Sequence, residues 1–215
     1  MSDKARADLA PTGALRAAIN LANPLLVTGR EADGTPVGVA PDMAAAIAGR
    51  LGVPLTLVPL ASAGAVADAV AADAWDIALI AFEPERAETI AFAPPYVEIE
   101  ATYLMPSRSP IRAIAEVDRL DVRIAISARS AYDLYLSRNL SHAELCRSKG
   151  LDGAFALFVE QGLDALAGLG PALIENADTP PGAWVLDGRY STAQKVVGTQ
   201  PGNPKALDFL TNFVI

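Results

Sequence analysis

Short apolar runs alternate along the first 95 residues with alanine-rich segments whose apolar positions repeat at helical spacing. Runs of strand length occupy residues 15–21, 53–59 and 77–82. Helical spacing marks residues 42–51 and 64–74. Strands that alternate with helices are typical of a mostly parallel sheet covered by helices. The pattern therefore predicts an α/β unit in this part of the chain.

The same alternation returns after residue 96. Strands are predicted over residues 97–105, 122–127 and 163–168, and helices over residues 130–140 and 152–161. The first of these strands is long enough to connect two lobes. A final strand and a final helix, which begins at an Asn-Pro pair, complete the chain.

Composition limits the possible functions. The 215 residues are 52% hydrophobic and 20% charged, which is enough to fill a core. A formal net charge of -8 without any basic tract excludes a nucleic-acid partner. The single cysteine, Cys146, excludes an internal disulfide and a cysteine-rich metal site, and the single histidine, His142, argues against a serine-type triad or a multi-histidine zinc site. We expect no metal ion, no cofactor and no catalytic residue.

The strongest candidate for chemistry is Arg86. It lies one helical turn beyond the carboxyl end of the predicted strand 77–82, after the break at Glu83-Pro84. Ligands bind at that end of the strands in open α/β sheets, and a guanidinium there forms two hydrogen bonds to a carboxylate. The local sequence leaves an alternative open, a surface arginine paired with Glu83 or Glu88.

Four segments, in order, carry a family resemblance: residues 15–20 (LRAAIN), 33–53 (DGTPVGVAPDMAAAIAGRLGV), 76–96 (DIALIAFEPERAETIAFAPPY) and 197–214 (VGTQPGNPKALDFLTNFV). Together they resemble the bacterial extracellular solute-binding proteins of the polar amino-acid ABC-transporter group. The resemblance implies a two-lobed, type II periplasmic-binding-protein-like α/β fold. In that fold, two mostly parallel sheets flanked by helices are joined by two crossover strands.

On this resemblance the chain divides into a discontinuous first lobe and a continuous second lobe. We expect residues 13–96 and 187–215 in lobe 1, residues 97–186 in lobe 2, and residues 1–12 as an N-terminal extension. A hinge motion across the two crossover strands is expected to close the lobes on a ligand.

The resemblance also implies roles for three residues. Arg86 would hold the ligand carboxylate, the backbone N–H of Ser130 would hold it as well, and Asp164 would bind the α-ammonium group. A helix that begins after Ser130 favours an anion at its N-terminus, although a plain N-cap explains the serine equally well. Asp164 stands on an otherwise apolar strand, where a bare carboxylate needs a partner.

Several positions depart from the family pattern. Ala78, Leu79 and Ala81 stand where the family usually has serines or threonines, so only backbone groups of Leu79 and Ala81 remain to bind a ligand. The positions of the family's aromatic stacking residues hold alanine or asparagine. We therefore expect a small amino acid or organic acid with an aliphatic or acidic side group, and poor binding of arginine and lysine. Arg129, beside Ser130, is either a second cation for an acidic ligand or a solvated surface arginine.

Three functions remain open on the sequence. The first is a non-enzymatic, monomeric receptor for a small carboxylate or amino acid that serves an ABC permease. The second is an enzyme similar to cyclohexadienyl or prephenate dehydratase, for which Glu98 and Glu100 are the candidate general acids. The third is a cytoplasmic ligand sensor. The family resemblance implies a periplasmic location, whereas the N-terminus lacks a signal-peptide pattern and no apolar stretch approaches the roughly 18 residues of a membrane span.

Overall fold

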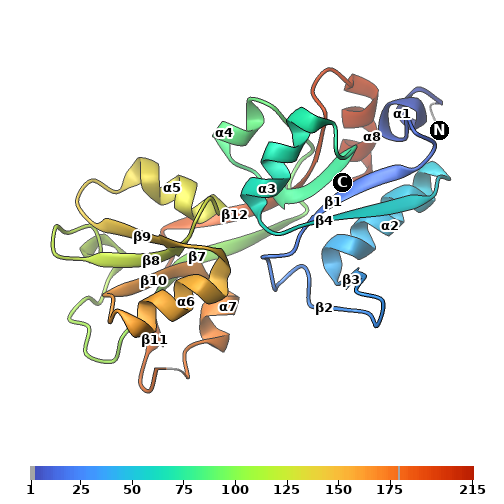
Figure 1. Ribbon diagram of the computed structural model, residues 1–215. Coiled ribbons are helices and arrows are strands. Elements are labelled where there is room, and N and C mark those ends of the chain that lie inside the picture. Colours follow the sequence, from blue (N-terminus) through green and yellow to red (C-terminus); the bar gives the residue numbers. More distant parts are fainter. Residues whose placement is uncertain (1–2, 179) are drawn as a thin grey trace. The chain divides into compact units, whose positions relative to one another are not determined.

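A computed structural model describes residues 3–178 and 180–215 (Figure 1). Residues 1–2 of the expected N-terminal extension and residue 179 of the expected second lobe lie outside this description. The chain forms two compact units, unit 1 from Met1–Glu98 with Gln194–Ile215 and unit 2 from Ile99–Ala193. It passes from one unit to the other twice, within strands β7 (Val97–Met105) and β12 (Ser191–Thr199). The predicted α/β class is confirmed.

Unit 1 is built on strands in the order β4-β1-β5-β12. Strands β1 (Leu15–Asn20), β4 (Leu55–Leu60) and β5 (Ile77–Ala81) run parallel, and β12 is antiparallel to β5. The other elements of the unit are α1 (Asp3–Leu9), β2 (Gly29–Arg30), β3 (Pro36–Val37), α2 (Val39–Leu51), α3 (Ala63–Asp68), the 3-10 helix η1 (Ala69–Ala72), α4 (Pro84–Ala87), β6 (Ala91–Phe92) and α8 (Pro204–Val214).

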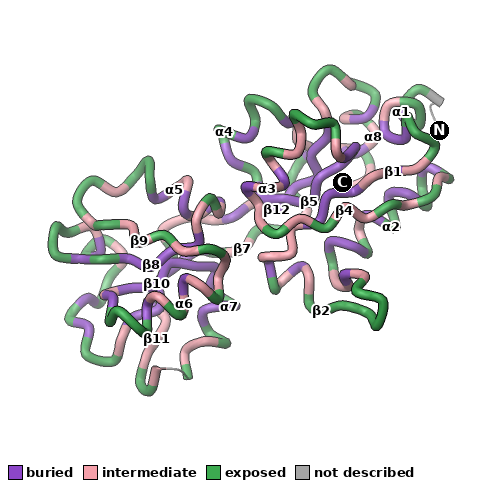
Figure 2. Tube along the Cα trace, viewed as in Figure 1, coloured by how far each residue is buried: buried purple, intermediate pink, exposed green. Residues whose placement is uncertain are grey.

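Alternate residues of each strand in unit 1 enter different cores, which explains the continuous apolar runs of the sequence. Ile77 and Leu79 of β5 pack with residues of α2 and α8, whereas Ala78 and Ile80 pack with α3 on the opposite face. Figure 2 shows β5 buried along its length. The N-terminal segment also belongs to this unit, because Leu9 of α1 is completely buried in the first of these clusters.

Unit 2 is built on strands in the order β7-β10-β8-β9, with β11 (Trp184–Val185) beside β7. Strands β8 (Arg123–Ser127), β9 (Glu144–Ser148) and β10 (Ala165–Leu169) are parallel, and β7 is antiparallel to β10. Helix α5 (Ala131–Asn139) packs on one face, and α6 (Gly150–Glu160) and α7 (Gly170–Glu175) pack on the other. None of the helices that the structure describes has the length and apolar character of a membrane span.

Local differences from the predicted elements have simple causes. Residues 24–26, which follow the first predicted strand, form a turn because the N–H groups of Leu26 and Val27 donate to the Asn23 carbonyl. Between β7 and β8 the chain forms the short 3-10 helix η2 (Ile114–Glu116). Helix α7 was not predicted, although Pro171 in its first turn is a common start signal.

Candidate functional site

Arg86 of unit 1 is a buried cation at the carboxyl end of a buried strand. Glu83, two residues beyond the end of β5, is extended and occupies the N-cap position of the one-turn helix α4, which begins at Pro84. Only 4% of Arg86 is exposed, and its Nη1 donates a hydrogen bond to the Ala81 carbonyl at 2.8 Å. The surface position in the alternative interpretation is therefore wrong, and a pairing with Glu83 or Glu88 stays a prediction.

The two other predicted ligand-binding positions in unit 1 lie on β5, and their roles remain predictions. Leu79 is 2% exposed and packs into the core, while Ala81 is 6% exposed. Their backbone groups belong to a strand that is hydrogen-bonded within the sheet, because β5 pairs with β12 and the N–H of Phe82 donates to the Gln194 carbonyl at 2.9 Å. The carbonyl of Ala81 orients Arg86.

Two charged residues near Arg86 are also buried, and one of them, Lys195, was not singled out in the sequence. Glu83 is 7% exposed and Lys195 is 6% exposed. Lys195 of β12 lies directly opposite Ala81 in the antiparallel register. Burial and then the charge of Arg86 lower the pKa of Lys195 from 10.5 to about 8. The signal that could have found Lys195 is its inward position in the apolar strand 191–199.

In unit 2, Ser130 is the N-cap of helix α5. Its Oγ accepts a hydrogen bond from the Asp133 N–H at 3.0 Å, and its own N–H donates to the Ser127 carbonyl at 3.3 Å. The plain capping role is therefore present, and binding of a carboxylate by the Ser130 N–H remains a prediction. Arg129 is exposed and adopts a left-handed backbone conformation, with φ 57°.

Asp133 holds this loop in place, and the sequence did not single it out. The residue is 3% exposed, and its Oδ2 accepts a hydrogen bond from the Arg129 N–H at 2.7 Å. Its Oδ1 accepts from Arg147 Nε at 3.0 Å. The backbone before α5 is thus fixed by a buried carboxylate.

Asp164 lies at the other end of the parallel strands of unit 2. It precedes β10, and its Oδ2 accepts a hydrogen bond from the N–H of Arg123, the first residue of β8, at 2.8 Å. Ser130 lies three residues beyond Ser127, the last residue of β8, so the length of that five-residue strand, about 13 Å, lies between the two sites. The Asp164 carboxylate has a charged partner within unit 2 as well, because Arg123 Nε approaches its Oδ2 to 3.9 Å.

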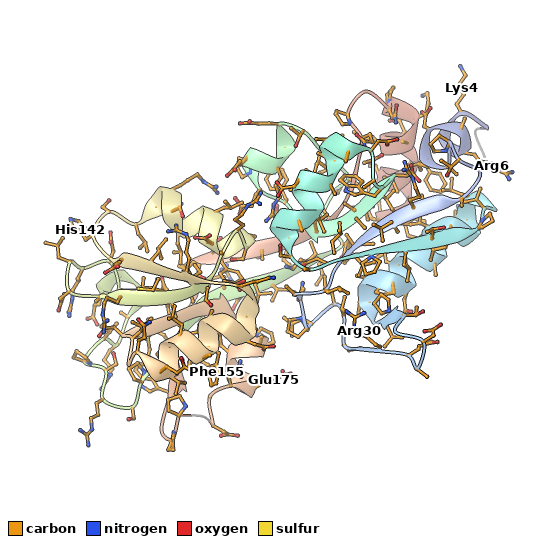
Figure 3. The ribbon with its side chains drawn as sticks, viewed as in Figure 1. Lys4, Arg6, Arg30, His142, Phe155 and Glu175 are labelled. Atoms are coloured by element: carbon orange, nitrogen blue, oxygen red, sulfur yellow. The ribbon has the colours of Figure 1, made fainter. Side chains whose placement is uncertain are left out.

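The candidate general acids are exposed and engaged by other side chains. Glu98 accepts a hydrogen bond from Gln194 Nε2 at 2.8 Å, and Glu100 pairs with Arg189. His142 projects from the surface of unit 2 (Figure 3) and approaches Asp118 to 3.4 Å. Within the described residues, no group of three or more histidine, cysteine, aspartate or glutamate side chains could hold a metal ion.

Comparisons with known proteins identify the family and the fold. The family model of bacterial extracellular solute-binding proteins, family 3, matches residues 15–214. A search of the curated proteins with this sequence finds no match. Solved structures of amino-acid-binding proteins share the fold, which is that of type II periplasmic binding proteins.

Three of these structures illustrate the likeness. The ancestral amino acid-binding protein AncCDT-1, a precursor of cyclohexadienyl dehydratase, is 21% identical with a TM-score of 0.81, over 97% of this chain and 91% of that one. Holo ArgBP from T. maritima is 20% identical with a TM-score of 0.80, and the match covers 96% of this chain and 91% of that one. A putative binding component of an ABC transporter from Wolinella succinogenes DSM 1740, complexed with lysine, is 19% identical with a TM-score of 0.79. The match covers 94% of this chain and 88% of that one.

Proposed function

The chain belongs to the bacterial extracellular solute-binding proteins, family 3, and from this premise we propose that it is a non-enzymatic receptor for a small amino acid or organic carboxylate. Its partner would be an ABC permease, and binding would close the two lobes around the ligand. The protein would act as a monomer, and it would act outside the cytoplasmic membrane because its family is extracellular.

The observation that carries this proposal is the burial of Arg86. A guanidinium that is 4% exposed at the end of a ligand-bearing strand is costly unless charged or polar groups surround it. The hydrogen bond to the Ala81 carbonyl orients the group, and the planar fork of a guanidinium matches a carboxylate. Ser130 and Arg129 are the residues that we propose as ligand contacts from unit 2.

The ligand that we propose carries an aliphatic or acidic side group. ArgBP and the lysine-bound Wolinella protein take cationic ligands, as their names state, but at 19–20% identity they share only the fold. Buried Lys195 beside Arg86 disfavours a cationic side chain by charge repulsion. Because Asp164 is paired with Arg123 at the start of its strand, we no longer assign it as the partner of an α-ammonium group.

A thermal-shift screen against amino acids and small dicarboxylates tests the proposal. A ligand at 100 times its dissociation constant stabilises the folded state by about 2.7 kcal/mol. We expect small acidic or aliphatic carboxylates to raise the melting temperature and arginine and lysine to leave it unchanged. A screen in which no carboxylate stabilises the protein would contradict a receptor for this class.

Two alternatives are tested by separate assays. AncCDT-1, described as a precursor of cyclohexadienyl dehydratase, motivates an assay for turnover of prephenate-like substrates. We expect no turnover, because Glu98 and Glu100 are exposed and bound to other side chains. A permease gene beside the reading frame would support transport, whereas its absence with ligand binding intact would support a sensor.

A further inference from the structure

Lys195 is a largely buried lysine without a counter-charge among the residues that the structure describes. It lies on β12, and 6% of it is exposed. Among the residues that the structure describes, the ammonium makes no hydrogen bond and no ion pair. Buried lysines are almost always paired, because removing an unpaired charge from water is expensive. The stability of the fold therefore does not explain why a lysine occupies position 195.

Arg86 brings a second cation to the same place. Lys195 is directly opposite Ala81, and the guanidinium of Arg86 donates to the carbonyl of Ala81 at 2.8 Å. Residues directly opposite in an antiparallel pair have Cα atoms about 4.5–5.5 Å apart. Both cations therefore gather around one residue at the end of β5, inside unit 1.

The other groups near this pair do not neutralise Lys195. Glu83 is buried on the neighbouring segment, yet the charge that acts on the pKa of Lys195 is that of Arg86, which lowers it. The Tyr96 N–H donates to the Lys195 carbonyl at 2.9 Å. The Tyr96 hydroxyl is buried without a hydrogen-bond partner among the described residues, and burial raises its pKa to about 12, so it remains a neutral donor.

Strand geometry places these groups on one face of the sheet. Side chains two residues apart on a strand share a face, so Lys195 points to the side of Val197. Val197 is part of the core cluster against which Tyr96 packs. The largely buried Lys195 side chain and the unpartnered Tyr96 hydroxyl thus both belong to the side of unit 1 that carries Val197.

We propose that Lys195 and Arg86 form a two-cation seat for a ligand with two carboxylate groups, such as an acidic amino acid or a short dicarboxylic acid. This inference rests on the proposed function and specifies its ligand class. One carboxylate would pair with the guanidinium and the other with the ammonium, and the Tyr96 hydroxyl would donate to either. A zwitterion with an uncharged side group would leave the Lys195 ammonium unpaired.

Isothermal titration calorimetry with matched ligands tests the seat. Glutamate is compared with glutamine, and aspartate with asparagine, because each pair differs by one charge at nearly equal size. We expect the parent protein to prefer at least one acid over its amide by about 30-fold or more. In Lys195→Gln the preference should fall to a few-fold, whereas the exposed control Lys205→Gln should retain it.

Proton uptake gives a second readout. An anion beside Lys195 raises the pKa of its ammonium, so the protein takes up a fraction of a proton when the ligand binds at pH 8.5. The uptake appears as a difference between the binding enthalpies measured in phosphate and in Tris, because the two buffers have different ionisation enthalpies. Lys195→Gln should abolish the uptake. Equal binding of acids and amides, or uptake unchanged in Lys195→Gln, would overturn the seat while leaving the receptor function intact. Binding of no carboxylate at all would overturn both.

Discussion

Replacing Lys195 by methionine should stabilise the ligand-free protein. The pKa of this ammonium falls from 10.5 to about 8 on folding, first because of burial and then because of the charge of Arg86. Each pKa unit corresponds to 1.36 kcal/mol, so the charged form costs about 3 kcal/mol at pH 7. Methionine has a similar length and no charge, so Lys195→Met should raise the free energy of unfolding by about 2–3 kcal/mol. The melting temperature should rise by roughly 4–12 °C.

The pH dependence separates this electrostatic cost from improved packing. Between pH 8 and pH 10.5 the unfolded chain keeps a proton that the folded protein has lost, so stability rises with pH. The rise should be present in the parent and absent in Lys195→Met. Urea denaturation at pH 7 and at pH 9.5 measures both effects.

Two results would refute this reasoning. One is a Lys195→Met variant that is less stable than the parent at pH 7. The other is a variant that keeps the full rise in stability between pH 7 and pH 9.5. If the prediction holds, the same substitution stabilises the free protein and weakens binding of a dicarboxylate, which is typical of a residue retained for function.

Three further predictions concern the framework of the two units. Asp76→Asn should lower the free energy of unfolding by about 3 kcal/mol in urea titrations, because buried Asp76 accepts 2.7 Å hydrogen bonds from the Arg16 backbone N–H and guanidinium; a loss below 0.5 kcal/mol would contradict this. Burial alone would raise the pKa of the Asp118 carboxyl, but hydrogen bonds from the N–H groups of residues 141–143 outweigh burial and lower the pKa to about 2. NMR titration of the carboxyl resonance measures this pKa, and a value near 4 would refute these contacts. Gly198→Ala should destabilise by about 1–3 kcal/mol, since a Cβ there would lie 2.6 Å from Ile90, whereas Gly49→Ala in open space within α2 should be neutral or stabilising; equal effects in thermal melts would contradict the packing.

The fold was predictable because the hydrophobic pattern and the element order agree. Strands such as β5 read as apolar runs, since alternate side chains enter two different cores. Helix α7 was missed because it follows β10 directly, without a polar loop to separate the two elements. Single-sequence patterns carry little information about such short connections.

The geometry of the candidate site was only partly predictable. The position of Arg86 beyond the end of β5 was predicted because a strand end followed by Glu-Pro marks it in the local sequence. Lys195 was not singled out because its place beside Ala81 depends on the register of two strands that lie far apart along the chain. Asp164 was placed within a strand predicted over residues 163–168, but β10 begins at Ala165. That shift moves the carboxylate to the amino ends of the parallel strands, away from Ser130.

The most direct test of the receptor function is calorimetric titration of Arg86→Ala with whichever carboxylate binds the parent. Loss of a buried, charge-assisted contact should cost about 2–5 kcal/mol, which is a loss of affinity of at least 30-fold. The exposed control Arg50→Ala, also in unit 1, should bind like the parent. If Arg86→Ala bound the ligand within a few-fold of the parent while Arg50→Ala did the same, Arg86 would not hold a carboxylate and the account would fail.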